Sequence, residues 1–164
     1  MHIALKWVTF AVAVVLVFAF SKYGFGPYAK QHEGHKTLDG TTFYAPSAVR
    51  TLLDNLGDFR TAYLEQERTV DLIFPLVYGL MFILPIVWLA PGARMPWWLA
   101  AVPLVAVVAD YTENFTVMAL LKRYPGDLGG LTILASVASG LKGVGLLGSM
   151  AVIVLLAILW VVRR

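Results

Sequence analysis

The sequence predicts an all-α integral membrane protein, with four transmembrane helices and a helical cap outside the membrane between the first and the second. Two observations predict this fold class. Of the 164 residues, 59% are hydrophobic and only 14% are charged, which is too apolar for a soluble domain of this length. In addition, four stretches are long enough to cross a bilayer, which takes about 20 apolar residues as a helix. We expect residues 1–164 to form a single membrane domain.

The predicted spans cover about residues 3–20, 70–90, 97–121 and 131–162. The last is longer than a bilayer requires, so we expect it to tilt or to protrude. The first has a second interpretation as a cleaved signal peptide, because Lys6 precedes its apolar run and the small residues Ala19 and Ser21 follow that run. With no polar residue between Lys6 and Ser21 except Thr9, this helix is predicted to form a wall that faces lipid.

The segment 21–69 is predicted to form the outer helical cap. Four apolar residues recur in it at helical spacing: Val49, Leu52, Leu53 and Leu56. Pro46 suits the first position of this helix, and Gly57 suits its end. Asp58 is then the predicted N-cap of a second helix, which continues without a break through 59–68 into the second span.

The distribution of charges predicts the orientation in the membrane. Both termini and the short loop 91–96 share one side, which carries basic residues and no acidic one: Lys6, Arg94, Arg163 and Arg164. Because an excess of Lys and Arg marks the cytoplasmic side, we expect both termini in the cytoplasm and the long first loop in the periplasm of a bacterial inner membrane. All five tryptophans fall near the same side: Trp7, Trp88, Trp97, Trp98 and Trp160.

Ionisable residues inside the spans mark the candidate site. A charge near the bilayer centre costs about 2.5–3.5 kcal/mol even on a lenient scale. Asp110, Glu113 and Asn114 share one helix face through their i, i+3, i+4 spacing. Counted from the loop near Gly126, Lys142 lies at the depth of Asp110, so the sequence predicts that these two residues form an ion pair.

The second span adds two residues to the predicted ligand-binding site. Tyr78 reaches the depth of Asp110, and Asp71 lies about two turns further out. The predicted site therefore consists of six residues: Asp71, Tyr78, Asp110, Glu113, Asn114 and Lys142. We expect access from the outer side along a polar stripe of Arg60, Glu67 and Asp71. For each residue the alternative is a structural role, in which the buried charges only set the register of the helices.

Three hypotheses for the function remain open at this stage. The first is a protein that binds a membrane lipid, or an accessory subunit that meets a membrane-protein partner through the outer cap. The second is an acid–base enzyme acting on a lipid or isoprenoid-like substrate, with Asp110 and Glu113 as catalytic candidates. That hypothesis expects Asp110 to pair with Lys142 and Glu113 to be buried without a cation. The third is a dimeric proton- or cation-coupled transporter, with Glu113 or Asp110 at the two-fold axis.

Other binding classes find little support in the sequence. The net charge of +3 comes from basic residues scattered around the spans, so we expect no nucleic-acid partner. The absence of cysteine excludes disulfide and thiolate chemistry. His32, Glu33 and His35 form a short H-E-x-H run, but no further ligand stands at zinc-site spacing, so we predict no metal and no cofactor. A homo-oligomer is compatible with all three hypotheses.

Several short motifs carry a resemblance to a known group of proteins. They are Tyr44-Ala45-Pro46, Leu52-Leu53, Leu56-Gly57 and Tyr63, then Asp71, Phe74-Pro75 and Tyr78-Gly79, then Asp110 and Glu113-Asn114. In these motifs the chain resembles a group of uncharacterised small bacterial four-helix membrane proteins, over most of its length after the first helix. The resemblance implies the four-span fold and brings no activity with it.

Overall fold

The structure, a computed structural model, describes residues 3–29, 36–38, 40–41 and 43–163. The chain begins with α1 (Ile3–Ala19), a π-helical turn (Phe20–Gly24) and the short α2 (Gly26–Ala29). After the first loop come α3 (Ala48–Leu56) and the long α4 (Phe59–Leu89). A 3-10 turn (Trp97–Ala100) leads into α5 (Ala101–Arg123), and α6 (Leu131–Val162) ends the described chain.

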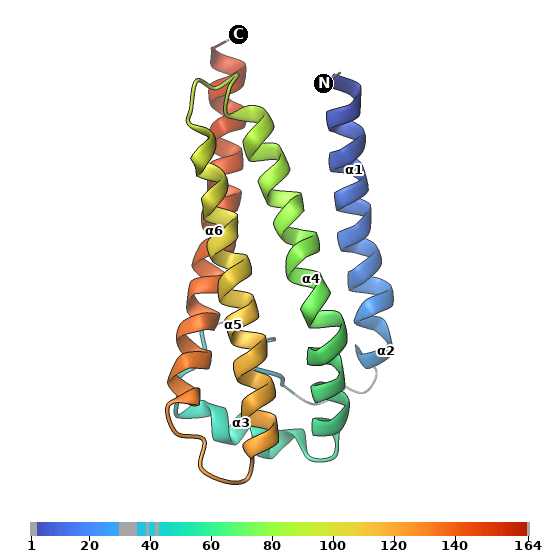
Figure 1. Ribbon diagram of the computed structural model, residues 1–164, viewed down its shortest axis with the longest axis vertical. Helices are drawn as coiled ribbons and strands as arrows, with labels where there is room; N and C mark the ends of the chain where they lie inside the picture. The colour runs from blue at the N-terminus through green and yellow to red at the C-terminus, as the bar shows by residue number, and fades with distance from the viewer. Residues whose placement is uncertain (1–2, 30–35, 39, 42, 164) are drawn as a thin grey trace.

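The predicted fold class is confirmed. Four helical segments are long and apolar enough to cross a membrane: Trp7–Tyr28, Phe59–Leu89, Trp97–Arg123 and Leu131–Val162. The short helix α3 lies between the first and second of them, as predicted. The amino terminus, the carboxyl terminus and the α4–α5 connection lie at one end of the molecule, and α3 and the α5–α6 loop lie at the other (Figure 1).

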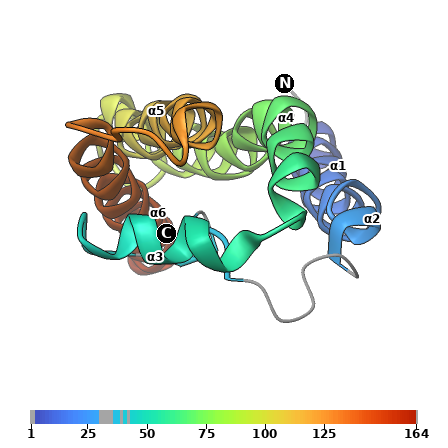
Figure 2. The same ribbon diagram turned by 90° about the horizontal axis from the view of Figure 1, so that it is seen from below.

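The helices α4, α5 and α6 form the packed part of the bundle, and α1 lies along the outside of α4 (Figure 2). Only 6% of the apolar window of the first span is buried inside the protein, against 61% for the third span. The side chains Val12, Val15 and Phe18 of this helix are exposed, which agrees with the predicted lipid-facing wall.

The helix α4 joins the cap to the second candidate span. It runs unbroken for 31 residues through Pro75 and Pro85, so the predicted continuation of the cap into the second span is confirmed. Asp58 occupies its N-cap position, although its side chain makes no capping hydrogen bond. The helix α3 begins at Ala48 with Ser47 as its N-cap, two residues later than predicted, because Pro46 lies in the turn that precedes it.

The cap is packed by its apolar face against the end of the bundle where the α5–α6 loop lies (Figure 1). Val49, Leu53 and Leu56 of α3 are fully buried, in one cluster with Tyr63 of α4 and Leu120 of α5. The periodic apolar residues of α3 therefore meet the membrane helices, and the opposite face of α3, which carries Arg50 and Thr51, is exposed.

Small residues allow α5 and α6 to approach closely. Ala135, Ser139 and Gly143 on α6 are buried, in agreement with the four-residue spacing of small residues in the sequence. The two helices are close at Gly145, where an added Cβ atom would lie 2.8 Å from the backbone nitrogen of Ala106.

The exposed face of α3 is fastened to the α5–α6 loop. The guanidinium of Arg50 donates hydrogen bonds to the carbonyl oxygens of Pro125 and Gly126, at 3.3 and 2.9 Å. Tyr124 donates a hydrogen bond to Asp54, and the guanidinium of Arg60 lies 4.6 Å from the centre of the Tyr124 ring. The cap is thus fixed by polar contacts outside the bundle and by apolar contacts inside it.

Replacing Asp54 with asparagine is expected to lower the pKa of Tyr124. The hydrogen bond to Asp54 is the main cause that holds this pKa above its ordinary value of 10.0. Because the pKa is raised in the folded protein, the stabilisation is present below about pH 10 and is lost as the pH rises through the raised pKa. Titration of the tyrosinate absorbance checks this, with Tyr124→Phe identifying the signal of Tyr124. Identical titrations of the native and Asp54→Asn proteins would contradict it.

Candidate functional site

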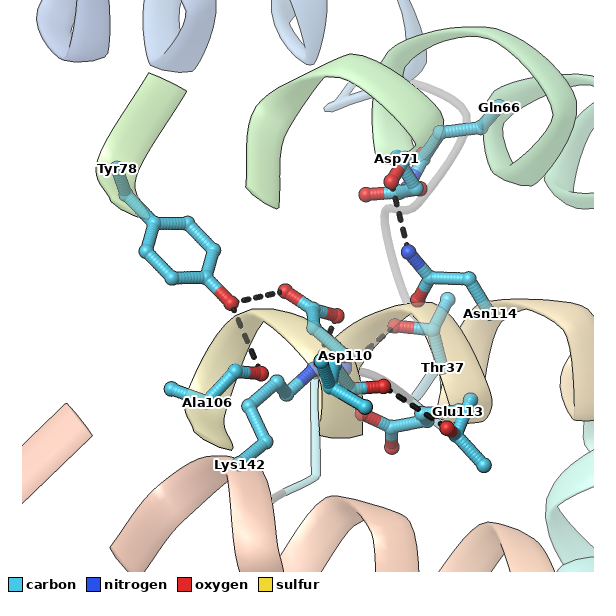
Figure 3. A network of polar contacts seen from close by, with 12 residues as sticks. Thr37, Gln66, Asp71, Tyr78, Ala106, Asp110, Glu113, Asn114 and Lys142 are labelled. Carbon is cyan, nitrogen blue, oxygen red and sulfur yellow. Dashed lines mark hydrogen bonds and ion pairs between the residues drawn. The ribbon is translucent and has the colours of Figure 1, made fainter. Parts of the chain in front are cut away.

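A buried ion cluster joins α5 and α6 (Figure 3). The ammonium of Lys142 lies 3.2 Å from Oδ1 of Asp110 and 2.5 Å from Oε2 of Glu113. The side chain of Glu113 is completely buried, and those of Asp110 and Lys142 are 9% and 15% exposed. Asp110 lies at the middle of the span Trp97–Arg123, so these charges belong to the interior of the membrane. The predicted ion pair therefore has the predicted partners and a further carboxylate.

Each carboxylate of the cluster also accepts a hydrogen bond from a tyrosine. The hydroxyl of Tyr78 on α4 donates to Oδ2 of Asp110 at 2.8 Å. The hydroxyl of Tyr44, from the loop before α3, donates to Oε1 of Glu113 at 3.3 Å. The contacts run from the cap to α5, to α6, back to α5 and on to α4, so one set of polar groups connects four parts of the protein. We call these five residues the ion cluster: Tyr44, Tyr78, Asp110, Glu113 and Lys142.

Two predicted site residues belong to a neighbouring polar group. The amide nitrogen of Asn114 donates a hydrogen bond to the backbone carbonyl of Asp71 at 2.7 Å. The amide of Gln66 donates to Oδ2 of Asp71 at 3.0 Å. This group fastens α5 to the half of α4 that is nearer to the cap, and Gln66 is a member that the sequence pattern did not reveal.

The structure corrects the expectation that Glu113 is buried without a cation. The ammonium of Lys142 contacts both carboxylates, because the i, i+3 spacing places Asp110 and Glu113 one helical turn apart on the face that meets α6. The predicted access route from solvent to the site ran along Arg60, Glu67 and Asp71. This route is not open in the structure, because Glu67 is completely buried.

Tyr44 is the cluster member that sequence reasoning did not identify. It lies in an irregular segment, where no periodicity points to burial, yet the residue is only 6% exposed. The available signal was the Tyr44-Ala45-Pro46 motif directly before α3, which places an aromatic residue at the edge of the cap.

Two of the grooves on the described part of the chain contain no residue of the ion cluster. The larger, of about 370 Å³, lies between α5 and α6 on the membrane-facing side, and its lining is apolar except for Thr112. It is lined by Ala101, Leu104, Val105, Val108, Ala109, Thr112, Leu134, Val137, Ala138 and Leu141. The smaller, of about 300 Å³, lies at the cap end of the bundle beside Gly57, Arg60 and Leu121.

The chemistry of the ion cluster is that of a shared counter-ion. One ammonium serves two carboxylates, and each carboxylate has a phenol as a further donor. Such an arrangement holds charge in a low-dielectric interior and links the helices that carry it. It does not separate the two carboxylates into one with and one without a cation, which was the premise of the acid–base hypothesis.

The described part of the chain contains no group of three or more His, Asp or Glu residues placed to hold a metal ion. The run of His32, Glu33 and His35 lies outside the described residues.

Comparisons with protein families, with curated proteins and with solved structures found no match to this chain. The resemblance to small bacterial four-helix membrane proteins therefore stays a prediction, and the functional argument depends on the geometry of the site.

Proposed function

We propose that this protein is an accessory subunit of a membrane complex and that its outer cap is the surface that binds the partner. The observation that carries the proposal is the ion cluster itself. Its charged groups contact one another within the same chain, and the cluster connects the cap to α4, α5 and α6. Buried polar networks of this kind serve to select one arrangement of the elements that they join.

The attachment of the cap supports a binding role. Apolar side chains hold it from within, and Arg50 and Tyr124 hold it to the α5–α6 loop from outside. A surface fixed in advance loses little conformational entropy when a partner binds. The exposed residues of α3 are polar, which suits a surface in contact with water. The proposal includes the orientation expected from the Lys and Arg residues, with the cap in the periplasm of a bacterial cell.

Photo-crosslinking in native membranes tests the proposal. A photoreactive residue at Thr51, on the exposed face of α3, is expected to give one protein adduct of defined mass. Val12 on α1 and Val144 on α6, both exposed to lipid, serve as comparison positions. Protein adducts at Val12 without adducts at Thr51 would show that the partner binds to α1 and not to the cap. Lipid adducts alone at all three positions would contradict an accessory role.

A second candidate function, the binding of a membrane lipid, is favoured by the groove between α5 and α6. Its apolar lining lies within the spans, and the Thr112 hydroxyl is bonded to the carbonyl of Val108 at 2.8 Å. An acyl or isoprenoid chain suits such a surface better than a polar ligand does.

Filling this groove is expected to remove a retained lipid. The substitution Val137→Phe, at an exposed residue of the lining, places a ring in the groove, and native mass spectrometry of the purified protein measures how much lipid stays bound. The control Val154→Phe adds a similar ring on the exposed surface of α6 outside the groove. Equal lipid retention in the two variants and the native protein would exclude this groove as a specific lipid site.

The remaining hypotheses receive less support. The acid–base hypothesis requires one carboxylate with a cation and one without, whereas Lys142 contacts both Asp110 and Glu113. The dimeric transporter expects Glu113 or Asp110 at a surface between two copies, whereas the Glu113 side chain is completely buried within one chain.

A further inference from the structure

Tyr44 connects the outer cap directly to a charge inside the membrane. Its side chain is buried beside the apolar residues that anchor the cap, which include Leu38 and Leu53. Its hydroxyl reaches Oε1 of Glu113, while Oε2 of the same carboxylate contacts the ammonium of Lys142. One carboxyl group, that of Glu113, therefore contacts both the cap and the ammonium of Lys142.

The backbone beside Tyr44 is strained. Phe43 has a φ of 60°, a left-handed conformation that bulky side chains rarely adopt. Its own side chain is 59% exposed, although the ring lies over Gly140 of α6, and an added Cβ atom there would be 3.7 Å from the ring. Little burial of Phe43 compensates for the strain, so the contacts of its neighbours must hold the turn. Such strain favours release of the segment once those contacts weaken.

We propose that Tyr44 and Glu113 form a latch, through which the charge of Glu113 controls whether the outer cap stays docked on the bundle. This latch would regulate the surface that the proposed function assigns to partner binding, but its operation requires no partner. The ligand of the latch is a proton that Glu113 takes up. A neutral carboxyl group loses the attraction to the Lys142 ammonium and is a weaker acceptor for the Tyr44 hydroxyl.

The groups that face Glu113 come from every element around it. Lys142 reaches it from α6 and Tyr44 from the cap, Asp110 lies one turn away on α5, and Tyr78 of α4 bonds to Asp110. A proton on Glu113 leaves the ammonium to Asp110, so the contact between α5 and α6 persists while the contact to the cap weakens. A proton on Glu113 therefore loosens the cap, which its apolar face and Arg50 still hold, and leaves the membrane bundle assembled.

Cysteine labelling of the purified protein in lipid discs tests the latch, because the chain has no cysteine of its own. Val49→Cys places a thiol on the buried face of α3, and Thr51→Cys places one on the exposed face of the same helix as the control. In the Val49→Cys protein, Tyr44→Phe is expected to speed labelling by a water-soluble maleimide roughly tenfold, since the cap loses a hydrogen bond to a charged acceptor. Labelling at Thr51→Cys is expected to stay unchanged.

The dependence on pH separates a latch from a merely structural contact. Divided by the rate at Thr51→Cys, the rate at Val49→Cys is expected to rise when the solution is acidified far enough for Glu113 to take up a proton. Glu113→Gln is expected to abolish this rise, because the amide cannot take up the proton. A pH-independent ratio in the protein with native Glu113, or the same rise with Glu113→Gln, would overturn the proposal. Unchanged labelling after Tyr44→Phe, a variant that leaves the charges intact, would overturn it independently.

This experiment and the crosslinking experiment can fail separately. The labelling uses purified protein without a partner, so it reports on the latch even if no partner is found. A defined adduct at Thr51 together with pH-independent labelling would retain the accessory role and remove the latch.

Discussion

Replacing Lys142 with methionine is expected to lower the free energy of unfolding by about 3–5 kcal/mol. The substitution leaves Asp110 and Glu113 without their shared ammonium, one helical turn apart and buried in the membrane interior. Two carboxylates in this position repel each other, and each loses its closest counter-charge. Unfolding by sodium dodecyl sulfate in mixed micelles, followed by the loss of helical circular dichroism, measures the change.

A triple variant serves as the control for Lys142→Met. Combining it with Asp110→Asn and Glu113→Gln removes the charges together and leaves side chains of similar size. Because replacing a whole buried ion cluster is often close to neutral, most of the lost stability is expected to return. Native stability of the single Lys142→Met variant would contradict the view that the ammonium compensates the two carboxylates.

Replacing Gly145 with valine is expected to force α5 and α6 apart. An added Cβ atom would lie 2.8 Å from the backbone nitrogen and 3.0 Å from the Cα of Ala106. Because these atoms belong to the backbone of a helix, they cannot rotate away as a side-chain end can. Overpacking of this kind costs about 1–3 kcal/mol. The same unfolding assay measures the loss, and the separation also weakens the contact of Lys142 with the carboxylates of α5.

The matched control for this prediction is Gly140→Ala on the same helix. An added Cβ atom there would meet only the Phe43 ring, at ordinary contact distances of 3.7 and 3.8 Å. Its stability is expected to stay close to native. If Gly140→Ala and Gly145→Val lowered the stability equally, the loss would come from changing a helical glycine and not from the close approach to Ala106.

The depth of residues in the membrane could be predicted from the sequence, because helices rise by a fixed amount per residue. Counting from the loops placed Asp110, Lys142 and Tyr78 at one level, and the structure brings these side chains into contact. The same counting could not show that the ammonium of Lys142 contacts two carboxylates. A lysine side chain is long enough to reach both Asp110 and Glu113, so its contacts depend on rotamers and packing that a depth count does not contain.

The closure of the site by the cap could not be predicted. The apolar spacing of α3 correctly indicated a face to be buried, yet the turn that carries Tyr44 into the bundle contains the left-handed Phe43, which no propensity would favour. The helix that α1 packs against could not be predicted either, for a related reason. All sides of an apolar helix are acceptable to lipid, so the sequence of α1 does not specify a neighbour, and the structure places it against α4.

The division of opposite charges between α5 and α6 has a consequence for the biogenesis of this protein. During synthesis, α5 leaves the ribosome with Asp110 and Glu113 before the lysine that compensates them has been made. Alone in lipid, each carboxylate would cost about 2.5–3.5 kcal/mol even on the lenient scale. The short loop Tyr124–Gly130 places α6 beside α5 as soon as α6 is complete. The free-energy cost of insertion is therefore lowest when α5 stays in the insertion machinery until α6 is complete. The two helices then enter the bilayer together as one paired hairpin.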